Sequence, residues 1–376
     1  MFARANRVGW IAVMVVGIAW AQEPASSASV VAASAVVVTN NDIAVVTPTP
    51  ATNAAASAVA PAPAETPVAA MPDPALKPAV RTNAMVQIAL DRQGFGSGLI
   101  DGVVGAKSHQ ALADFCVANG GLKEKVAKQR LVGDAAPAFV SYEITADDLA
   151  QIGDAPTDWE VAAKLPTMAC HTLPDLLSEK FHSGQGFLRT LNPAVLDWQN
   201  VAVGQRIWVP NVRPVEWKTN LAQVVIDTHE FRLRGYDTTG HLLCSFPCSI
   251  ARNREKVPTN DLTVVNIAPN PNYTFDPANF PESARAKQIG HKLILPPGPR
   301  NPVGVYWISL SQPGYGMHGT PHPETIGNME SHGCFRLCNW DAHSLGNMTT
   351  IGMPVLLDEP PRVLTPAAAV PAAAKP

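Results

Sequence analysis

A long low-complexity segment near the N-terminus limits which part of this chain can form a packed domain. From residue 22 to about residue 80 it consists almost entirely of Ala, Val, Pro, Ser and Thr, with very few charged or aromatic residues. Such a segment buries too little apolar surface to offset the entropy that a chain loses on folding. We therefore expect a disordered tether over residues 22–80 and a disordered Pro/Ala-rich tail over residues 359–376. The 376 residues suffice for two or three domains, which must lie between these segments.

The N-terminus has the three parts of a secretory signal peptide. Arg4 and Arg7 form a short positive region, residues 8–20 are apolar, and Ala19-Trp20-Ala21 is a small-x-small cleavage site. We expect residues 1–21 to be removed and the mature protein to be exported to the periplasm or cell envelope. An uncleaved anchor helix is the alternative. No other apolar stretch is long enough to suggest a membrane span.

Charge and cysteine content narrow the class of protein further. A net charge of −3, without a stripe of Lys and Arg, argues against a nucleic-acid partner. Six cysteines are too few for a disulfide scaffold, and their spacing leaves any pairing in an oxidising compartment open. Cys244 and Cys248 would lie about 13 Å apart on one strand, so we expect them to be small buried side chains and not a bridge.

Two helices around a glycine-rich turn open the folded region. Apolar residues have helical spacing over residues 85–90 and 107–119. The turn between them contains Leu99-Ile100-Asp101-Gly102 and Gly105, and the second helix carries Ala111-Leu112 and Phe115. These residues resemble the signature of the peptidoglycan-binding-like three-helix domain. The resemblance implies a small α-helical domain over residues 81–135.

Residues 136–212 combine short helices with a final strand. Leu173, Leu176 and Leu177 have helical spacing, Asn192-Pro193 closes a second helix, and Ile207-Trp208-Val209-Pro210 reads as a strand. The pattern resembles a divergent LysM module, although Cys170-His171 stands where that family has Gly-Asp. We expect a LysM-like segment here. Whether this segment and the preceding domain bind glycan or only pack stays open.

Residues 213–358 alternate β-rich runs with turns. One helix is predicted over residues 339–347, and Asp237-Thr238-Thr239-Gly240 predicts a hairpin turn. Strands are predicted over residues 222–227, 230–236, 241–250, 262–268, 293–295, 303–308 and 355–357. The fold class is therefore multidomain, with a mainly-β domain, a sandwich or a curled sheet, at the C-terminal end.

Reactive side chains gather in one part of this domain. Cys334 can act as a nucleophile once a base takes its proton, and the imidazoles of His318 and His332 are the two candidate bases. Gly333 allows a close approach and lets backbone N–H groups point at an oxyanion. Arg336 can hold a carboxylate through two hydrogen bonds. This pattern predicts acyl transfer through a thioester.

The same block resembles the L,D-transpeptidase catalytic domain of the YkuD type. The family's "HG" and "SHGC.R" motifs stand here as His318-Gly319 and Ser331-His332-Gly333-Cys334-Phe335-Arg336. The resemblance implies that Cys334 is the nucleophile, His318 the general base, and the Gly319 carbonyl the group that orients His318. It implies pocket and oxyanion support from His332 with the backbone of Gly333 and Cys334. Arg336, Ser331 and Tyr315 are expected at the substrate site.

The resemblance also implies the reaction. Cys334 would attack the L-centre carbonyl of diaminopimelate in a peptidoglycan tetrapeptide stem and release D-Ala, and an amine would resolve the thioester. No cofactor or metal is expected, and we expect a monomer that contacts stem peptides and glycan, with an envelope protein as one possible acyl acceptor. The family's "TP.G" motif is replaced by Val257-Pro258-Thr259-Asn260-Asp261, which bears on acceptor choice.

Several alternatives stay open at this point. Water could resolve the thioester, which would make the protein an L,D-carboxypeptidase. The chain could be a non-catalytic peptidoglycan-binding protein, although its intact His318, Cys334 and Arg336 argue against this. His318, His322, His332 and Cys334 are zinc-ligand types, but no HExxH helix accompanies them. A Cys334–Cys338 disulfide would need a geometry that residues four apart on a helix rarely have.

Overall fold

The computed structural model describes residues 73–134, 136–213, 215, 217, 219–280, 282–331 and 333–364. All of these belong to one compact unit of the chain. The expected signal peptide and residues 22–72 of the expected tether lie outside the described residues, as do residues 365–376 of the tail. Among the described helices, none has both the length and the apolar character that crossing a bilayer requires.

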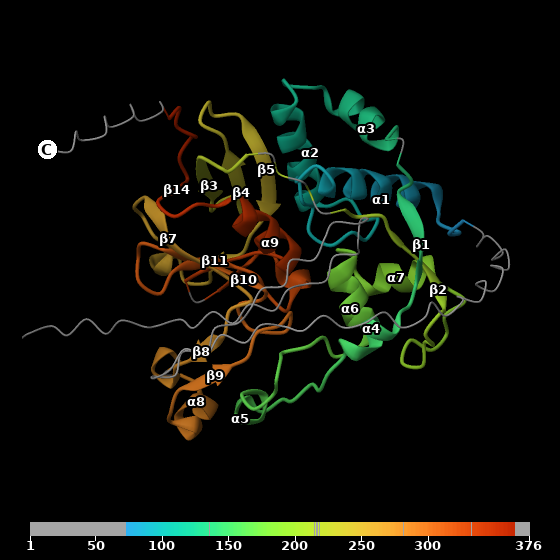
Figure 1. Ribbon diagram of the computed structural model, residues 1–376. Coiled ribbons are helices and arrows are strands. Elements are labelled where there is room, and N and C mark those ends of the chain that lie inside the picture. Colours follow the sequence, from blue (N-terminus) through green and yellow to red (C-terminus); the bar gives the residue numbers. More distant parts are fainter. Residues whose placement is uncertain are drawn as a thin grey trace, which may run out of the picture. The chain divides into compact units, whose positions relative to one another are not determined.

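The N-terminal region is helical (Figure 1). It contains α1 (Pro78–Asp91), α2 (Ala106–Ala118) and α3 (Glu124–Val132). Proline suits the first position of α1 because the N–H that it lacks would have no partner there. That helix therefore begins inside the stretch that the sequence assigns to the tether. Leu90, Phe115 and Leu131 form a shared core. Periodicity predicted α1 and α2, whereas only the resemblance to a three-helix domain implied a third helix, because the exposed, charged surface of α3 weakens the periodic signal.

A second small core lies in the middle region. Its strands β1 (Phe139–Glu143) and β2 (Arg206–Pro210) pair antiparallel. Thr145 and Asp148 form a capping box that starts α4. Leu177, Leu188 and Ile207 are fully buried between these strands and helices. The helices of the region are α4 (Ala146–Ala150), α5 (Trp159–Ala162), α6 (Leu173–Lys180) and α7 (Gln185–Leu191).

The C-terminal domain is built on one eight-stranded mixed sheet, in the order β13-β11-β10-β7-β14-β3-β4-β5. Of the two forms that the sequence allowed, the curled sheet is confirmed and the sandwich is not observed. The strands are β3 (Gln223–Asp227), β4 (Arg232–Tyr236), β5 (Leu242–Pro247), β7 (Leu262–Pro269), β10 (Tyr306–Leu310), β11 (Gly316–His318), β13 (Phe335–Arg336) and β14 (Pro354–Leu357).

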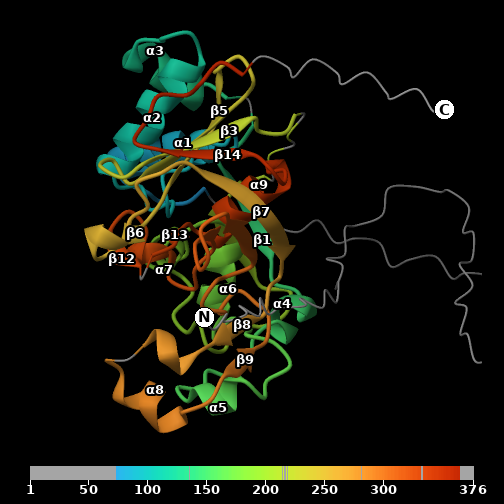
Figure 2. The same ribbon diagram turned by 90° about the vertical axis from the view of Figure 1, so that its left-hand side faces the viewer.

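Shorter elements complete this domain. Strand β6 (Ile250–Ala251) pairs with β12 (Met329–Ser331), and β8 (Tyr273–Phe275) pairs with β9 (Leu293–Leu295). The predicted helix is α9 (Asn339–Met348), which packs against β10. The expectation that it is the only helix was wrong, because α8 (Ala284–Ile289) lies between β8 and β9. Both views show α5 and α8 beside the β8–β9 pair (Figure 2).

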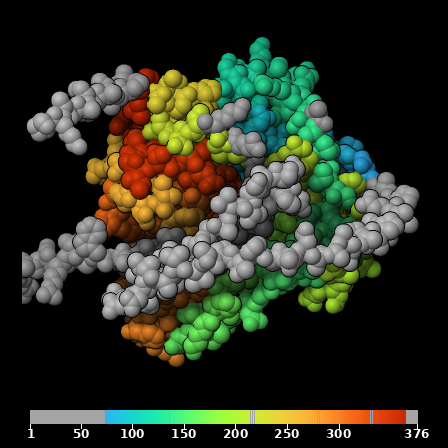
Figure 3. All heavy atoms as spheres, viewed as in Figure 1, coloured from blue at the N-terminus to red at the C-terminus, as the bar shows by residue number. Residues whose placement is uncertain are grey.

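The helical region covers one face and one edge of the sheet. Gly96 N–H donates to the Ser245 carbonyl and Ser245 N–H donates to the Gly94 carbonyl, both at 2.9 Å. The fully buried Arg232 donates to Asp114 of α2 at 3.2 Å and to the Ser245 hydroxyl at 2.7 Å. In the space-filling view, the teal atoms of the helices adjoin the yellow atoms of β5 (Figure 3). The edge of β5 is thereby protected from pairing with other chains.

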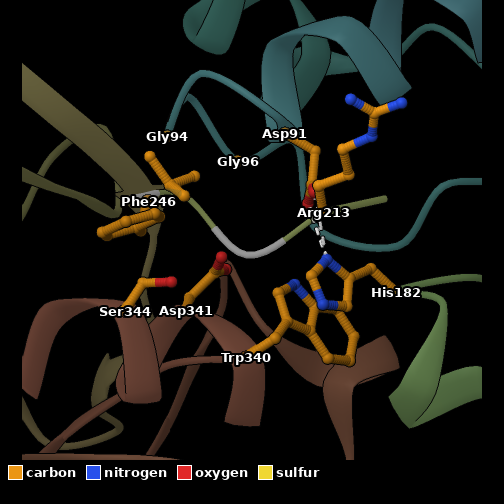
Figure 4. Close-up of a pocket in the computed structure, with 10 residues that line it drawn as sticks. Asp91, Gly94, Gly96, His182, Arg213, Phe246, Trp340, Asp341 and Ser344 are labelled. Carbon is orange, nitrogen blue, oxygen red and sulfur yellow. Dashed lines mark hydrogen bonds and ion pairs between the residues drawn. The ribbon is translucent and has the colours of Figure 1, made fainter. Parts of the chain in front are cut away.

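The three regions meet around a small cavity of about 20 Å³ (Figure 4). His182 of the middle region pairs with Asp91 of α1 at 2.9 Å and stacks on Trp340 of α9 at 4.8 Å. Asp341, also on α9, lines the same cavity and is buried, which raises its pKa well above the usual range. The regions that the sequence analysis treats as separate modules therefore share an interior.

Candidate active site

The nucleophile and the base lie on neighbouring strands. Cys334 immediately precedes β13, which runs parallel to β11 with Met317 opposite Phe335 and His318 opposite Arg336. Met317 and Phe335 are fully buried in the core of the domain. Because side chains alternate along a strand, their neighbours His318 and Arg336 project to the opposite face, and Cys334 follows the same alternation. The structure thus brings together the three residues on which the sequence-based mechanism depends.

His318 is held in one tautomer. Its Nδ1 lies 2.7 Å from the Gly319 carbonyl oxygen, and its ring stacks on Trp307 at 5.2 Å. A carbonyl only accepts, so Nδ1 carries the proton and Nε2 has a free lone pair. Burial lowers the pKa of His318 to about 4, an effect that the Gly319 hydrogen bond opposes and the charge of Arg336 reinforces. The imidazole is therefore neutral and able to accept a proton at neutral pH.

The surroundings of Cys334 favour its neutral thiol form. Its side chain is half-buried, and Sγ donates to the Gly314 carbonyl at 3.4 Å. Burial raises the pKa of the thiol to about 11, although a hydrogen bond from Gly316 N–H and the charge of Arg336 lower it. Burial therefore favours the neutral thiol and imidazole over a thiolate–imidazolium pair. The proton must leave sulfur as the nucleophile attacks.

The loop before Cys334 is closed by its own hydrogen bonds. The Ser331 hydroxyl donates to the Cys334 carbonyl at 2.6 Å and accepts from Gly333 N–H at 3.3 Å. The Tyr315 ring lies against Gly333, since a Cβ added at Gly333 would be 3.3 Å from it, and the Tyr315 hydroxyl donates to the Lys256 carbonyl. Ser331 therefore shapes the loop. The oxyanion role of Gly333 and the substrate roles of Ser331 and Tyr315 stay predictions.

The remaining sequence-predicted residues are less informative. His332 lies outside the described residues, so its role in the pocket stays a prediction. His322 is an exposed loop residue 3.3 Å from Glu324. All six cysteines are free thiols, and Cys244 and Cys248 are fully buried, as expected. Within the described part of the chain, no three His, Cys, Asp or Glu side chains are grouped as metal ligands.

Two further residues, which the sequence motifs do not contain, contact the base His318 or the glycine that orients it. Trp307 pairs with His318 across β10 and β11, and its ring stacks on the imidazole. Asn339 is buried at the start of α9, and its Oδ1 would lie 2.2 Å from a Cβ added at Gly319. Alternation along β10 could have placed Trp307 on the face opposite Ile308. No local signal identifies Asn339, because its contacts come from distant parts of the chain.

Replacing Gly319 by alanine is expected to destabilise the fold and to slow the reaction. The added methyl group must displace Asn339 or shift the Gly319 peptide whose carbonyl holds His318, at a cost of about 1–3 kcal/mol. Urea unfolding and kcat would measure the two effects. Gly186→Ala is the matched control, because an added Cβ meets no atom within 4 Å there, and it should be neutral or slightly stabilising. Wild-type stability in Gly319→Ala would contradict the packing argument.

An aromatic cluster lies close to the nucleophile. Burial raises the pKa of Tyr273 on β8 to about 12, and a charge on Cys334 would raise it further. Trp159 of α5 packs on Phe275 at 4.7 Å and on Tyr273 at 6.2 Å. Arg285 of α8 pairs with Glu160 at 3.0 Å and also with Asp158. Through this ring packing and these ion pairs, the middle region holds the β8–β9 segment in place beside Cys334.

Comparisons with known proteins match the C-terminal domain to a known family. Residues 222–357 match the family model of the YkuD L,D-transpeptidase catalytic domain. A Bacillus licheniformis protein named as the L,D-transpeptidase YkuD is 26% identical over 176 residues, which are 47% of this chain and 87% of that protein. Its Bacillus subtilis namesake is 42% identical over 60 residues, covering 16% of this chain and 37% of that protein.

A third relative extends the likeness beyond Bacillus. The Escherichia coli protein YcfS, named as an L,D-transpeptidase, is 32% identical over 136 residues, which are 35% of this chain and 42% of that protein. Neither the helical region nor the middle region falls within the matched family model. With the arrangement of β11 and β13, the match identifies residues 222–357 as an L,D-transpeptidase catalytic domain of the YkuD family, a family of cysteine-type transpeptidases.

Proposed function

We propose that this protein is a peptidoglycan L,D-transpeptidase with Cys334 as its nucleophile and His318 as its general base. The observation that carries the proposal is the 2.7 Å contact between His318 Nδ1 and the Gly319 carbonyl oxygen. The Nδ1–H bond to Gly319 leaves Nε2 unprotonated on the face that Cys334 and Arg336 share. The family acts on the cell wall, and a stem peptide is the substrate that this resemblance implies.

The reaction can be written as two acyl transfers. As Sγ of Cys334 attacks the L-centre carbonyl of diaminopimelate, its proton passes to Nε2 of His318. Backbone N–H groups near Cys334 stabilise the oxyanion. The N–H of Gly333 donates to the Ser331 hydroxyl in the structure, so it can contribute only after that hydrogen bond breaks. Collapse of the intermediate expels D-Ala, which takes the proton from His318, and leaves a thioester. An amine acceptor then attacks the thioester and passes a proton to His318, and the departing sulfur takes that proton as the C–S bond breaks, which regenerates the thiol.

Arg336 is proposed to contact the substrate carboxylate. It stands opposite His318 in the strand register, and its backbone is fixed by two hydrogen bonds with Ser249, at 2.8 and 2.9 Å. Its positive charge lowers the pKa of both His318 and Cys334. A cation in this position favours a neutral base, an ionised thiol and a bound anion at the same time.

The assignments of the two N-terminal regions belong to this proposal as well. We infer an exported enzyme with a peptidoglycan-binding-like helical region and a LysM-like middle region. In the structure the turn at Ile100 is engaged by the protein itself. Its N–H donates to the His182 carbonyl at 2.8 Å, and its carbonyl accepts from Gly184 N–H at 3.0 Å. These contacts favour a packing role for that turn.

Intact-mass spectrometry of the mature protein with a tetrapeptide-stem muropeptide tests the proposal. We expect a thioester adduct on Cys334 with loss of D-Ala, and a dimer when a second stem is present as acceptor. An adduct that only hydrolyses would identify an L,D-carboxypeptidase instead. No adduct, with retained binding to murein sacculi, would favour a non-catalytic wall-binding protein.

A further inference from the structure

A carboxyl group from outside the catalytic domain contacts Asn339, the residue that packs against Gly319 next to the base His318. Glu179, on α6, accepts a hydrogen bond from Nδ2 of Asn339 at 3.2 Å, across 160 residues of sequence. The same Nδ2 donates to the Pro299 carbonyl at 3.0 Å, and Oδ1 accepts from Val305 N–H at 3.3 Å. Both partners of Nδ2 are acceptors and the partner of Oδ1 is a donor, so the amide has one orientation.

The Asn339 amide is wedged between two glycines. A Cβ added at Gly304 would lie 2.0 Å from its Oδ1, and one added at Gly319 would lie 2.2 Å from it. The Gly319 carbonyl is the group that binds Nδ1 of His318. In so tight a packing, a shift of the Asn339 side chain moves the Gly319 peptide and with it the imidazole.

We propose that Glu179 is a positioning residue for the general base, because its carboxyl group holds the Asn339 amide against Gly319 and so fixes the orientation of His318. The inference rests on the proposed function, in which His318 takes the proton of Cys334. It assigns the middle region a part in catalysis that is independent of any binding to glycan.

A second contact from α6 reaches the same loop. Asp175, one helical turn before Glu179, accepts from Arg300 at 3.2 Å, and Arg300 also donates to the Pro321 carbonyl. Pro321 lies three residues after His318. The loop that carries the base is therefore held by α6 on two sides, through Asn339 and through Arg300. A contact that merely joined the two regions would not need to converge on this loop.

The charges around Glu179 give the contact a pH dependence. Burial raises the pKa of Glu179 to about 8, while the hydrogen bond from Asn339 lowers it. Asp175 and Glu324 raise this pKa further, and Arg300 lowers it. Below pH 8 the carboxyl group is mostly neutral and accepts the Asn339 bond as a glutamine would. Above pH 8 it is ionised, and a charge-assisted bond is stronger.

Two substitutions separate the hydrogen bond from the volume of the side chain. Glu179→Leu removes the acceptor at similar size, and we expect kcat to fall by roughly tenfold or more with KM little changed. Glu179→Gln keeps an acceptor oxygen and should retain kcat at pH 6. Between pH 7 and pH 9 the kcat of the wild-type enzyme should rise relative to that of Glu179→Gln, because the carboxyl group of Glu179 ionises and the amide of glutamine does not.

A second readout does not depend on peptidoglycan. The rate at which iodoacetamide alkylates Cys334 reports proton removal from the thiol, so it should fall in Glu179→Leu but not in Glu179→Gln at pH 6. Glu143→Leu is the matched control, since Glu143 is exposed on β1 and pairs with Arg206. It should change neither readout. If wild-type Cys334 is alkylated but forms no acyl-enzyme, the proposed function is refuted. The role of Glu179 is then still tested by comparing the alkylation rates of the variants.

Two results would overturn the inference. One is a wild-type alkylation rate in Glu179→Leu, and the other is an equal loss in Glu179→Leu and Glu179→Gln. If Glu179→Leu does not fold, as judged by its melting temperature, Glu179→Asp replaces it. The shorter side chain keeps a carboxyl group but withdraws it from Asn339, so it should show the same loss. Wild-type rates in Glu179→Asp would then overturn the inference.

Discussion

Replacing Cys334 by alanine is expected to abolish acyl-enzyme formation and to lower turnover of a tetrapeptide stem by roughly 10⁴-fold or more. The thiol is the nucleophile in the proposed reaction, and the remaining groups only bind the stem and stabilise charge. Alanine removes one sulfur atom from a half-buried position, so the fold should remain intact. Intact mass and the release of D-Ala would measure the loss, and the melting temperature would show that the protein is folded.

Another free cysteine provides the control for this experiment. Cys116 lies on α2 and is 9% exposed, in the core of the helical region and away from β11 and β13. Cys116→Ala should keep its acyl-enzyme and its turnover, with at most a modest loss of stability from the smaller side chain. If Cys334→Ala still formed a covalent adduct, another residue would be the nucleophile, and the mechanism argued here would be wrong.

The parts of the fold that could be predicted are those with a strong local signal. The strands β3, β7, β9 and β14 follow their apolar runs within a residue or two, and α9 begins where Asn339 was expected to start a helix. Strand β10 is shorter than predicted, because residues 301–304 form a turn in which Gly304 has a φ of 63°. Apolar residues in a turn resemble a strand when periodicity is the only guide.

For the active site, the sequence predicts which residues take part but not their protonation states. The sequence motifs lead to Cys334, His318 and Arg336, because residue type and spacing alone carry that signature. The neutral state of the pair does not follow from the motifs. It depends on burial, which lowers the pKa of His318 and raises that of Cys334. Burial is a property of the packed structure, so no spacing of residues along the chain could have revealed it.

The arrangement of the regions was also beyond the sequence. The resemblances suggested separate modules on a tether, and the structure instead joins them through polar contacts between residues more than 100 positions apart. Arg232 with Asp114 and Asn339 with Glu179 are examples. Each of these residues, read alone, looks like an ordinary surface charge or amide. Only the fold shows that the catalytic domain is hydrogen-bonded to its neighbouring regions at these points.

The second large effect is expected at the base. His318→Gln should lower kcat by roughly 10²–10⁴-fold, because the amide cannot take the proton of Cys334. In the wild-type enzyme the imidazole pKa of about 4 lies below the ordinary value for histidine, so His318 stays neutral as the pH falls through 6. The rate should therefore hold between pH 7 and pH 5 and decline only as the pH approaches 4.

The acid limb of the pH–rate profile tests the physical cause of this prediction. If His318 were exposed, its protonation would halve the rate near pH 6.5. Burial penalises the imidazolium and moves that midpoint to about 4. The exposed His322 supplies the control, since His322→Gln should leave both the rate and the acid limb unchanged. A wild-type midpoint near 6.5 that persists in His318→Gln would transfer the role of base to another group, and His332 would be the first candidate.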